Sequence, residues 1–461
     1  MLTKNKITNK LEQILDKSRV LTSKEECYAY AQDGTNNRVS RMLPDAVVFP
    51  ESIEEVQEVL RYANNNKIPI TARGAGTNLI GGALPDIGGI VLNLSRMKRI
   101  ISVSKTDMTA TVEAGVVVGQ LLTEVENIGL FFPPDPSNLR VSTIGGAIVQ
   151  SAGGPKTFKY GTVKDYILGL TIVLADGTIM KTGASTIKNA TGYNLTQLFV
   201  GSEGTLGIVV EAVLKLIPKP ETTSVVMAYY DSLDTAVESV THIVESNIYP
   251  ATIDFMENNS IRTVEKFYPA NLLTDKEAVL IIELDGSITA VEADKQKLCS
   301  ILEKYGASNI IVSNSKEEAD RIWTARRSSF AAAAKLKPDV ISDDVIVPRS
   351  KLAQLVKETK NICAKYNLHT CIVGHVGDGN IHPQIVLNLD DEVECLNYIR
   401  AKEEIYKLTL SLGGTLSAEH GIGLEKKKYI PQAIDPVALN YMHKMKQLFD
   451  PNNILNPDKA I

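Results

Sequence analysis

The stretch Arg73-Gly-Ala-Gly-Thr-Asn-Leu-Ile-Gly-Gly82 decides the fold of the first half of this 461-residue chain. A β-rich run, IPITA, precedes it and another follows at 90–95, so the sequence predicts strand, loop, strand. A Rossmann unit would place a helix directly after a GxGxxG loop and is therefore excluded. Because glycine tolerates positive φ and lets a ligand approach the backbone, this loop can bind phosphate through its N–H groups. A glycine-rich hairpin loop without a ligand is the alternative.

Two further glycine-rich blocks follow in the same half of the chain, at 131–154 and 191–208. Three such loops exceed what turns alone require, and they indicate one long ligand lying against backbone. From 109 to 217 short β-branched runs alternate with these turns, which predicts a mixed α+β domain.

The prolines at 218 and 220 mark a change of pattern, and we expect a domain boundary at 217–223, dividing the chain into 1–219 and 220–461. In the first part, helices are expected at 7–17 and 52–66, the second opened by a capping box of Ser52 and Glu55. The second part alternates strand-like runs with helix-period stretches and is expected to be a sheet with helices on one face. These stretches are 234–246, 291–305, 315–334, 350–366, 392–412 and 436–449.

Composition excludes several classes of protein. The 49 Lys+Arg against 54 Asp+Glu leave a net charge of −5, which does not favour a nucleic-acid or anionic-membrane surface. Five cysteines without a CxxC pair argue against a disulfide framework, an iron–sulfur cluster and a thiolate zinc site, and favour a cytoplasmic protein. We expect neither a signal peptide nor a membrane span.

The chain has six histidines, none before residue 242, and two of them lie in Gly374-His-Val-Gly-Asp-Gly-Asn-Ile-His382. If Val376 and Ile381 flank a four-residue hairpin turn, His375 faces His382 and their Cβ atoms lie about 5 Å apart, so both rings can reach one metal ion. The alternative is two histidines that never meet.

A third motif, Gly413-Gly-Thr-Leu-Ser-Ala-Glu-His-Gly-Ile-Gly423, offers a carboxylate as the third ligand. Its Glu419 and His420 lie within glycine-flanked backbone, and an exposed pair in a capping turn is the alternative. Two histidines and one carboxylate suit zinc, iron(II) or manganese.

The blocks RGAGTNLIGG, PPDPS…STIGG…AGG, KYG, TGYNLTQLFVGSEGTLGI and FDPNNILNP resemble those of the vanillyl-alcohol-oxidase-type FAD family over about residues 40–460. Within that family they are similar to the branch of FAD-dependent D-lactate dehydrogenases and bacterial glycolate oxidases. The resemblance implies a two-subdomain FAD-binding fold, then a mixed-sheet substrate (cap) domain, with the tail 449–461 returning to the FAD.

The resemblance also implies which residues bind FAD. Carried over motif by motif, they are Arg73, Gly74, Ala75, Gly76, Thr77, Asn78, Gly81, Gly82, Pro134, Asp135, Thr143, Gly145, Gly146, Gly153, Glu203, Gly204, Ile208 and Asn456. Many relatives tether FAD through a histidine in the first loop, but position 77 is threonine here and Cys27 is far in sequence. We therefore expect non-covalent FAD.

For the second part, the resemblance implies that His375, His382 and Glu419 hold the divalent metal and that His420 is the catalytic base. Arg326, three positions after Trp323 on an expected helix, matches the arginine that binds the substrate carboxylate, although Arg327 stands beside it. Relatives that oxidise 2-hydroxyglutarate carry a lysine where this chain has Ser342, and a small polar residue where it has Phe330. This favours a small monocarboxylate such as lactate or glycolate.

The prediction is therefore FAD-dependent oxidation of a small D-2-hydroxy acid, D-lactate above all, to the 2-oxo acid. The alternatives are a glycolate oxidase catalytic subunit, an alcohol or sugar oxidase on the same fold, and a flavin-carrying subunit without catalysis. The chain has no NAD fingerprint, haem motif or cluster-binding cysteines, so electrons must pass to an external acceptor: oxygen, a quinone or a protein. The resemblance implies that an electron-transferring flavoprotein linked to NAD is one such partner.

Overall fold

The computed structural model describes residues 4–35 and 40–461, and these form two compact units. The first unit contains the chain up to Gly153, Thr162–Lys219 and Glu419–Ile461, and the second contains Gly154–Gly161 and Pro220–Ala418. The chain leaves the first unit at the prolines that mark the predicted boundary. These units differ from the predicted domains 1–219 and 220–461 in two places: 154–161 lies in the second unit, and the segment that returns to the first unit begins at 419.

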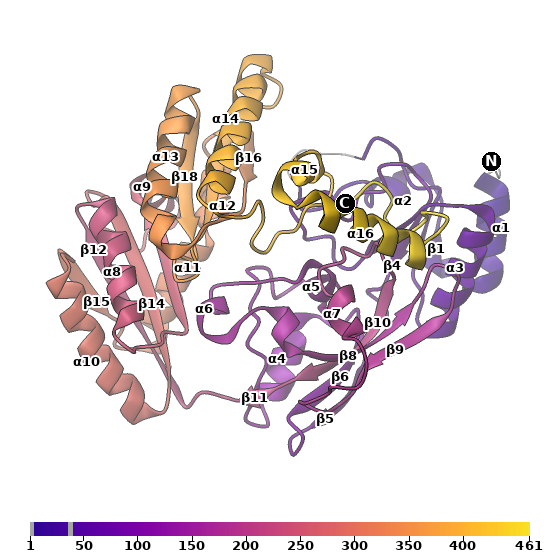
Figure 1. Ribbon diagram of the computed structural model, residues 1–461, viewed down its shortest axis with the longest axis horizontal. Coiled ribbons are helices and arrows are strands. Elements are labelled where there is room, and N and C mark those ends of the chain that lie inside the picture. Colours follow the sequence, from indigo (N-terminus) through magenta and orange to yellow (C-terminus); the bar gives the residue numbers. More distant parts are fainter. Residues whose placement is uncertain (1–3, 36–39) are drawn as a thin grey trace. The chain divides into compact units, whose positions relative to one another are not determined.

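The first unit contains a four-stranded sheet of order β1-β2-β4-β3, a five-stranded antiparallel sheet of order β5-β6-β10-β8-β9, and the short pair β11-β7 (Figure 1). Its strands are β1 (Val20–Leu21), β2 (Ala46–Val48), β3 (Ile70–Arg73), β4 (Ile90–Asn93), β5 (Ile100–Ser104), β6 (Thr109–Glu113), β7 (Leu130–Phe131), β8 (Ile167–Val173), β9 (Ile179–Gly183), β10 (Ile208–Lys215) and β11 (Ile217–Pro218). Two sheets with their own helices match the predicted pair of α+β subdomains.

The helices of the first unit are α1 (Lys4–Ile14), α2 (Lys24–Tyr28), α3 (Ile53–Asn66), α4 (Val118–Glu126), α5 (Ile144–Gln150), α7 (Leu195–Phe199), α15 (Ile430–Ala433) and α16 (Pro436–Phe449), with short 3-10 turns at Lys17–Arg19, Val163–Tyr166 and Lys427–Tyr429. Helix α3 begins where expected, because the Ser52 side chain accepts a hydrogen bond from Glu55 N. The capping box itself does not form, since the Glu55 carboxylate binds Arg19 and Glu51 N instead.

The first glycine-rich loop lies between neighbouring strands of the first sheet. Strands β3 and β4 are parallel and paired from Ile70↔Ile90 to Arg73↔Asn93, and residues 74–89 between them contain no helix. The predicted order of strand, loop, strand is therefore confirmed. The hairpin alternative is excluded, because a tight hairpin joins antiparallel strands only.

The second unit is built on one sheet of order β15-β12-β14-β13-β18-β19-β16, with β17 also pairing β19. Its strands are β12 (Thr222–Tyr230), β13 (Thr252–Glu257), β14 (Ala278–Gly286), β15 (Asn309–Val312), β16 (Asp339–Ser342), β17 (Val345–Ile346), β18 (His369–Gly374) and β19 (Asn380–Leu387). Every pairing among these strands is antiparallel, so the expectation of a mixed sheet is wrong for this unit.

The helices of the second unit are α6 (Thr157–Tyr160), α8 (Leu233–Glu245), α9 (Asn258–Phe267), α10 (Ile288–Lys304), α11 (Lys316–Arg327), α12 (Ser329–Ala333), α13 (Leu352–Lys365) and α14 (Glu392–Ser411), with a 3-10 turn at Arg349–Lys351. The sequence indicates all of the long ones except α9, and it joins α11 to α12 across Ser328.

Helices cover both faces of this sheet, not one as expected. Side chains alternate along a strand, so Val225, Met227 and Tyr229 of β12 share a face, and they pack with α9, α11 and α12. The intervening Val226 and Tyr230 point to the opposite face, where α8 and α10 contact β12 and β14 (Figure 1). The face that carries α11 and α12 is the one that matters for the candidate site.

The excursion of the chain at 154–161 is explained by charge. Lys156 Nζ lies 3.2 Å from a Glu283 carboxylate oxygen, and Lys159 forms an ion pair with Asp285. Tyr160 also donates a 2.7 Å hydrogen bond to Asp285. The two acids stand on β14, so this segment packs with the second unit.

Among the described residues, no helix is long and apolar enough to cross a membrane.

Candidate active site

The first two glycine-rich blocks meet within the first unit. A Cβ atom on Gly74 would lie 2.2 Å from Thr143 Oγ1, so only glycine fits there against the start of α5. Thr143 Oγ1 in turn accepts from Gly146 N, which caps that helix. The Thr77 and Ser142 hydroxyls are 3.5 Å apart. The loop after β3 and the start of α5 therefore pack directly against each other.

The third block and the C-terminal tail join the same surface. Glu203 N donates to Val149 O at 2.8 Å, and Asn456 Nδ2 donates to Glu203 O at 2.6 Å. The tail runs beside β3, where Ile70 N donates to Ile454 O and Asn456 N donates to Ile70 O. Three blocks far apart in sequence thus converge, as one long ligand would require.

The Glu203 carboxylate binds the backbone of a distant loop, a contact that the sequence does not predict. It accepts hydrogen bonds from Ile422 N at 2.7 Å and Gly423 N at 2.8 Å, and burial raises its pKa. This carboxylate thereby holds the chain directly after His420 in the first unit. Its predicted contact with FAD cannot use these two oxygens without displacing that loop.

The other predicted FAD residues occupy varied environments. Arg73 donates from Nη1 to Gln32 O at 2.7 Å and lies over the Tyr30 ring, and burial lowers its pKa. The Ile208 side chain belongs to the hydrophobic core. The rest lie in or beside the three blocks: Ala75, Gly76, Asn78, Gly81, Gly82, Pro134, Asp135, Gly145, Gly153 and Gly204.

In the second unit, His375 and His382 come together, but not by the predicted register. Strands β18 and β19 pair Val373 with His382, and Asn380 N donates to His375 O. His375 is therefore opposite residue 380 rather than 382. Gly379, with φ of +89°, closes the turn earlier than expected. His382 becomes the diagonal neighbour on the same face, and the ring centroids are 5.1 Å apart.

Both rings are buried, and each Nδ1 lies near an oxygen. His382 Nδ1 lies 3.3 Å from Asp343 O, and His375 Nδ1 lies 3.6 Å from Asp254 Oδ2. Ligand atoms of the two histidines approach within 4.8 Å. With each Nδ1 directed at an oxygen, the Nε2 atoms are the ones suited to a metal ion.

The positions of Glu419 and His420 follow from contacts of the residues that precede and follow them in the chain. Ser417 Oγ and Ala418 N donate to Asp344 Oδ2 at 2.7 and 2.9 Å, so Asp344 holds the residues before Glu419 in the second unit. Glu419 and His420 open the segment that belongs to the first unit.

Arg326 lies on α11 beside Trp323, as predicted, but its guanidinium is already paired. Nε and Nη2 bind the same oxygen of Asp254 at 3.0 and 2.9 Å, and Nη1 lies 3.4 Å from Ser329 Oγ. This ion pair lowers the pKa of Asp254 against the opposing effect of burial. Nη1 carries two hydrogens and, among the described residues, contacts only Ser329 Oγ, so this nitrogen keeps a donor for a substrate carboxylate.

Sequence reasoning missed Gln384, which lies two residues after His382 on the same face. Its Nε2 donates to Ser329 Oγ at 3.3 Å, and its Oε1 is buried without a partner among the described residues. Ser342 is directly opposite Gln384 in the β16–β19 ladder. The two-residue spacing from His382 in a strand was the available signal. An unsatisfied buried oxygen here marks a place for a hydrogen-bond donor.

Comparison with known proteins decides the family. Residues 44–183 match the model described as FAD binding domain, and 219–460 match FAD linked oxidases, C-terminal domain. The chain is 40% identical over 459 residues to glycolate oxidase subunit GlcD of Bacillus subtilis, covering 100% of this chain and 97% of that protein. It is 33% identical to the D-lactate dehydrogenase of Anaerostipes hadrus, covering 99% and 98%.

The chain belongs to the family of FAD-linked oxidases. The fold of this FAD-linked oxidase matches solved structures at low identity: p-cresol methylhydroxylase has a TM-score of 0.83 at 18% identity and covers 99% of this chain and 96% of that one. The predicted vanillyl-alcohol-oxidase-type fold and the oxidoreductase class are therefore confirmed.

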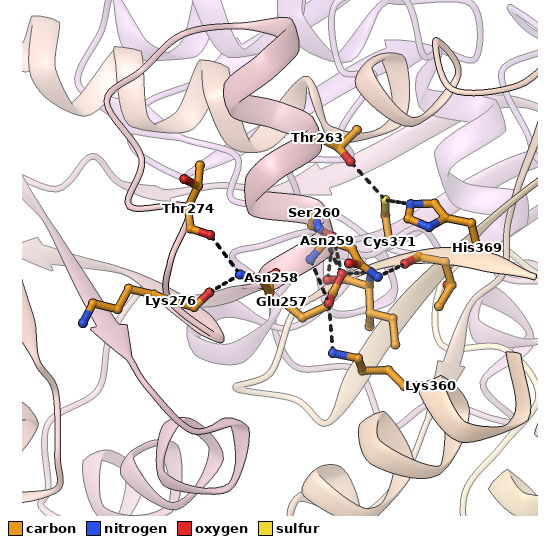
Figure 2. Close-up of polar contacts among 12 residues, drawn as sticks. Glu257, Asn258, Asn259, Ser260, Thr263, Thr274, Lys276, Lys360, His369 and Cys371 are labelled. Carbon is orange, nitrogen blue, oxygen red and sulfur yellow. Dashed lines mark hydrogen bonds and ion pairs between the residues drawn. The ribbon is translucent and has the colours of Figure 1, made fainter. Parts of the chain in front are cut away.

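The FAD-linked oxidase carries a second buried polar cluster away from the histidine pair (Figure 2). Glu257 accepts from Ser260 N at 2.9 Å, capping α9, and from Ile372 N at 3.2 Å, and Lys360 lies 3.2 Å away. Burial raises the pKa of the nearby Cys371 to about 11, so this thiol stays protonated at neutral pH. The cluster fastens α9 to the sheet, which is a structural role.

Proposed function

We propose that this chain oxidises a small D-2-hydroxy acid, D-lactate above all, to the 2-oxo acid, using non-covalent FAD and one divalent metal ion. The observation that carries the proposal is the buried pair of His375 and His382, with each Nδ1 near an oxygen, in a member of the FAD-linked oxidase family. An alcohol or sugar oxidase on the same fold would account for the glycine-rich blocks but not for this pair.

The cofactors have residues that fit them. The convergent backbone of the three glycine-rich blocks, 73–82, 131–154 and 191–208, suits the long FAD molecule, with Asn456 completing it from the tail. Bound FAD supplies a hydride acceptor. Two imidazoles with Glu419 suit zinc, iron(II) or manganese, and such an ion lowers the pKa of a bound hydroxyl.

The protein's own groups then act on the substrate. His420 takes the proton of the C2 hydroxyl as general base, because it adjoins Glu419 in the chain and is held after it by the Glu203 clamp. Arg326 Nη1 attracts the substrate carboxylate. Ser342 and the apolar Phe330 offer no cation for a second carboxylate, which favours a small monocarboxylic acid.

The electron acceptor is external to the chain. We propose a redox protein such as an electron-transferring flavoprotein, and a cytoplasmic setting, which the free state of the described cysteines supports. Glycolate oxidation is the second candidate, favoured by the name of the Bacillus subtilis relative.

Rapid mixing of the FAD-loaded protein with D-lactate or glycolate under anaerobic conditions tests the proposal. We expect D-lactate to bleach the flavin faster than glycolate, and chelation of the metal to abolish bleaching by either. Bleaching by simple alcohols or sugars alone would contradict the proposal. Reduction of NAD only after an electron-transferring flavoprotein is added would support the partner.

A further inference from the structure

Asp254 stands between two residues of the candidate site. Its side chain is 1% exposed, and its two oxygens point to different partners. Oδ1 receives Nε and Nη2 of Arg326, while Oδ2 lies 3.6 Å from His375 Nδ1. One carboxylate therefore contacts both the predicted substrate arginine and a predicted metal ligand.

The sheet fixes this arrangement. Strands β13 and β18 pair Phe255 with Gly374, so Asp254 and His375 are the next residues outward on adjacent strands. Phe255 N also donates to Asp254 Oδ1 at 2.7 Å, which restrains the carboxylate against its own backbone. The position of Asp254 thus follows from strand pairing and not from a flexible loop.

The Nδ1 atoms of the two histidines face different groups. The nearest oxygen to His382 Nδ1 is the Asp343 carbonyl at 3.3 Å, which no side-chain substitution removes, and Asp344 Oδ1 lies farther away at 3.9 Å. His375 Nδ1 faces a side chain, so this contact can be removed by one substitution. A carboxylate on the far nitrogen of a metal-binding histidine fixes the tautomer and the ring orientation.

We infer that Asp254 is a positioning residue that orients His375 Nε2 toward the metal and at the same time holds Arg326 beside it. The inference rests on the proposed metal centre. It also explains why Nε and Nη2 of Arg326 both bind Asp254: this ion pair fixes the position of Nη1.

The test is Co²⁺ binding by the full-length, FAD-loaded protein after metal removal, followed by the visible absorption of bound Co²⁺. We expect Asp254→Asn to weaken Co²⁺ binding about 10- to 100-fold and to change the cobalt spectrum. Arg326→Gln should leave Co²⁺ affinity close to wild type, because Asp254 and His375 remain. A role limited to charge compensation would instead make the two variants alike.

Glu257→Gln is the matched control. Glu257 is a buried carboxylate on the same strand, it serves the separate cluster of Figure 2, and it contacts neither histidine. We expect wild-type affinity from it. The double variant Asp254→Asn with Arg326→Gln removes both charges of the buried pair, so it carries the test if the single variant does not fold, and it should bind as weakly as predicted for Asp254→Asn.

The outcomes separate the two claims. No Co²⁺ binding by the wild type would overturn the metal centre and, with it, the role of Asp254. Binding by the wild type and equal binding by the Asp254 variants would overturn the role of Asp254 alone.

Discussion

The clamp formed by Glu203 gives a prediction whose size follows from its hydrogen bonds. Glu203→Ala would leave Ile422 N and Gly423 N, now 2.7 and 2.8 Å from the carboxylate, without acceptors. A buried donor left unsatisfied costs about 1–3 kcal/mol; Gly423 N is buried and Ile422 N is part-buried, so the two cost at most about 2–6 kcal/mol of the free energy of unfolding of the first unit. Burial raises the pKa of this carboxyl and opposes its charge, which places the loss toward the lower end.

Glu203→Gln keeps one acceptor oxygen and should lose about half as much. The surface carboxylate Glu58, paired with Arg61 on α3, provides the control, and Glu58→Gln should change stability by less than about 0.5 kcal/mol.

Two optical signals make the assay specific for the first unit. Flavin fluorescence on release reports the FAD-binding unit, whereas the single tryptophan, Trp323, lies in the second. In urea unfolding, Glu203→Ala should move the flavin transition to lower urea and leave the tryptophan transition nearly in place. A flavin transition unchanged within about 0.5 kcal/mol would refute the clamp.

Four further predictions follow from the same structure. His420→Asn should give folded, yellow protein in which D-lactate reduces the flavin at least about 100-fold more slowly, and wild-type reduction would contradict the base assignment. Burial lowers the pKa of Lys459 from 10.5 to about 8. Between these pH values the unfolded chain binds more protons than the folded chain, so the free energy of unfolding rises with pH. In urea titrations, Lys459→Met should remove about 3 kcal/mol of that rise compared with wild type. Gly89→Ala should lower the melting temperature, because Gly89 has φ of +80° and its Cβ would lie 2.2 Å from Pro69 O; an unchanged melting temperature would count against this packing. Acid precipitation should release all flavin into the supernatant, and yellow pellets would reveal a covalent link.

The features that could be predicted from the sequence are local ones. The glycines at 73–82 predict a loop, and the β-branched runs on either side predict that this loop lies between two strands. Long helices such as α13 and α14 show their period and end near the expected residues. The number of glycine-rich blocks predicts one long ligand, and the blocks do lie together, as the contact of Glu203 N with Val149 O shows.

The features that escaped prediction depend on tertiary structure. His375 is opposite residue 380, two residues from the expected partner His382, because Gly379 adopts positive φ in the turn. The histidines still meet, since a change of partner by two residues keeps both side chains on one face of the sheet. Asp254 lies over a hundred residues before His375, and only strand pairing brings it there. Likewise, helix α9 completes the second helical layer, which local periodicity did not indicate.

Anaerobic titration of the flavin absorbance, before and after removal of the metal, determines whether this protein oxidises D-2-hydroxy acids by a metal-dependent reaction. The substrates are D-lactate, L-lactate, glycolate and D-2-hydroxyglutarate. The account predicts stoichiometric bleaching by D-lactate, weaker bleaching by glycolate, none by L-lactate or D-2-hydroxyglutarate, and no bleaching by any acid once the metal is gone. Full bleaching by D-lactate in metal-free protein, or a preference for D-2-hydroxyglutarate, would contradict it.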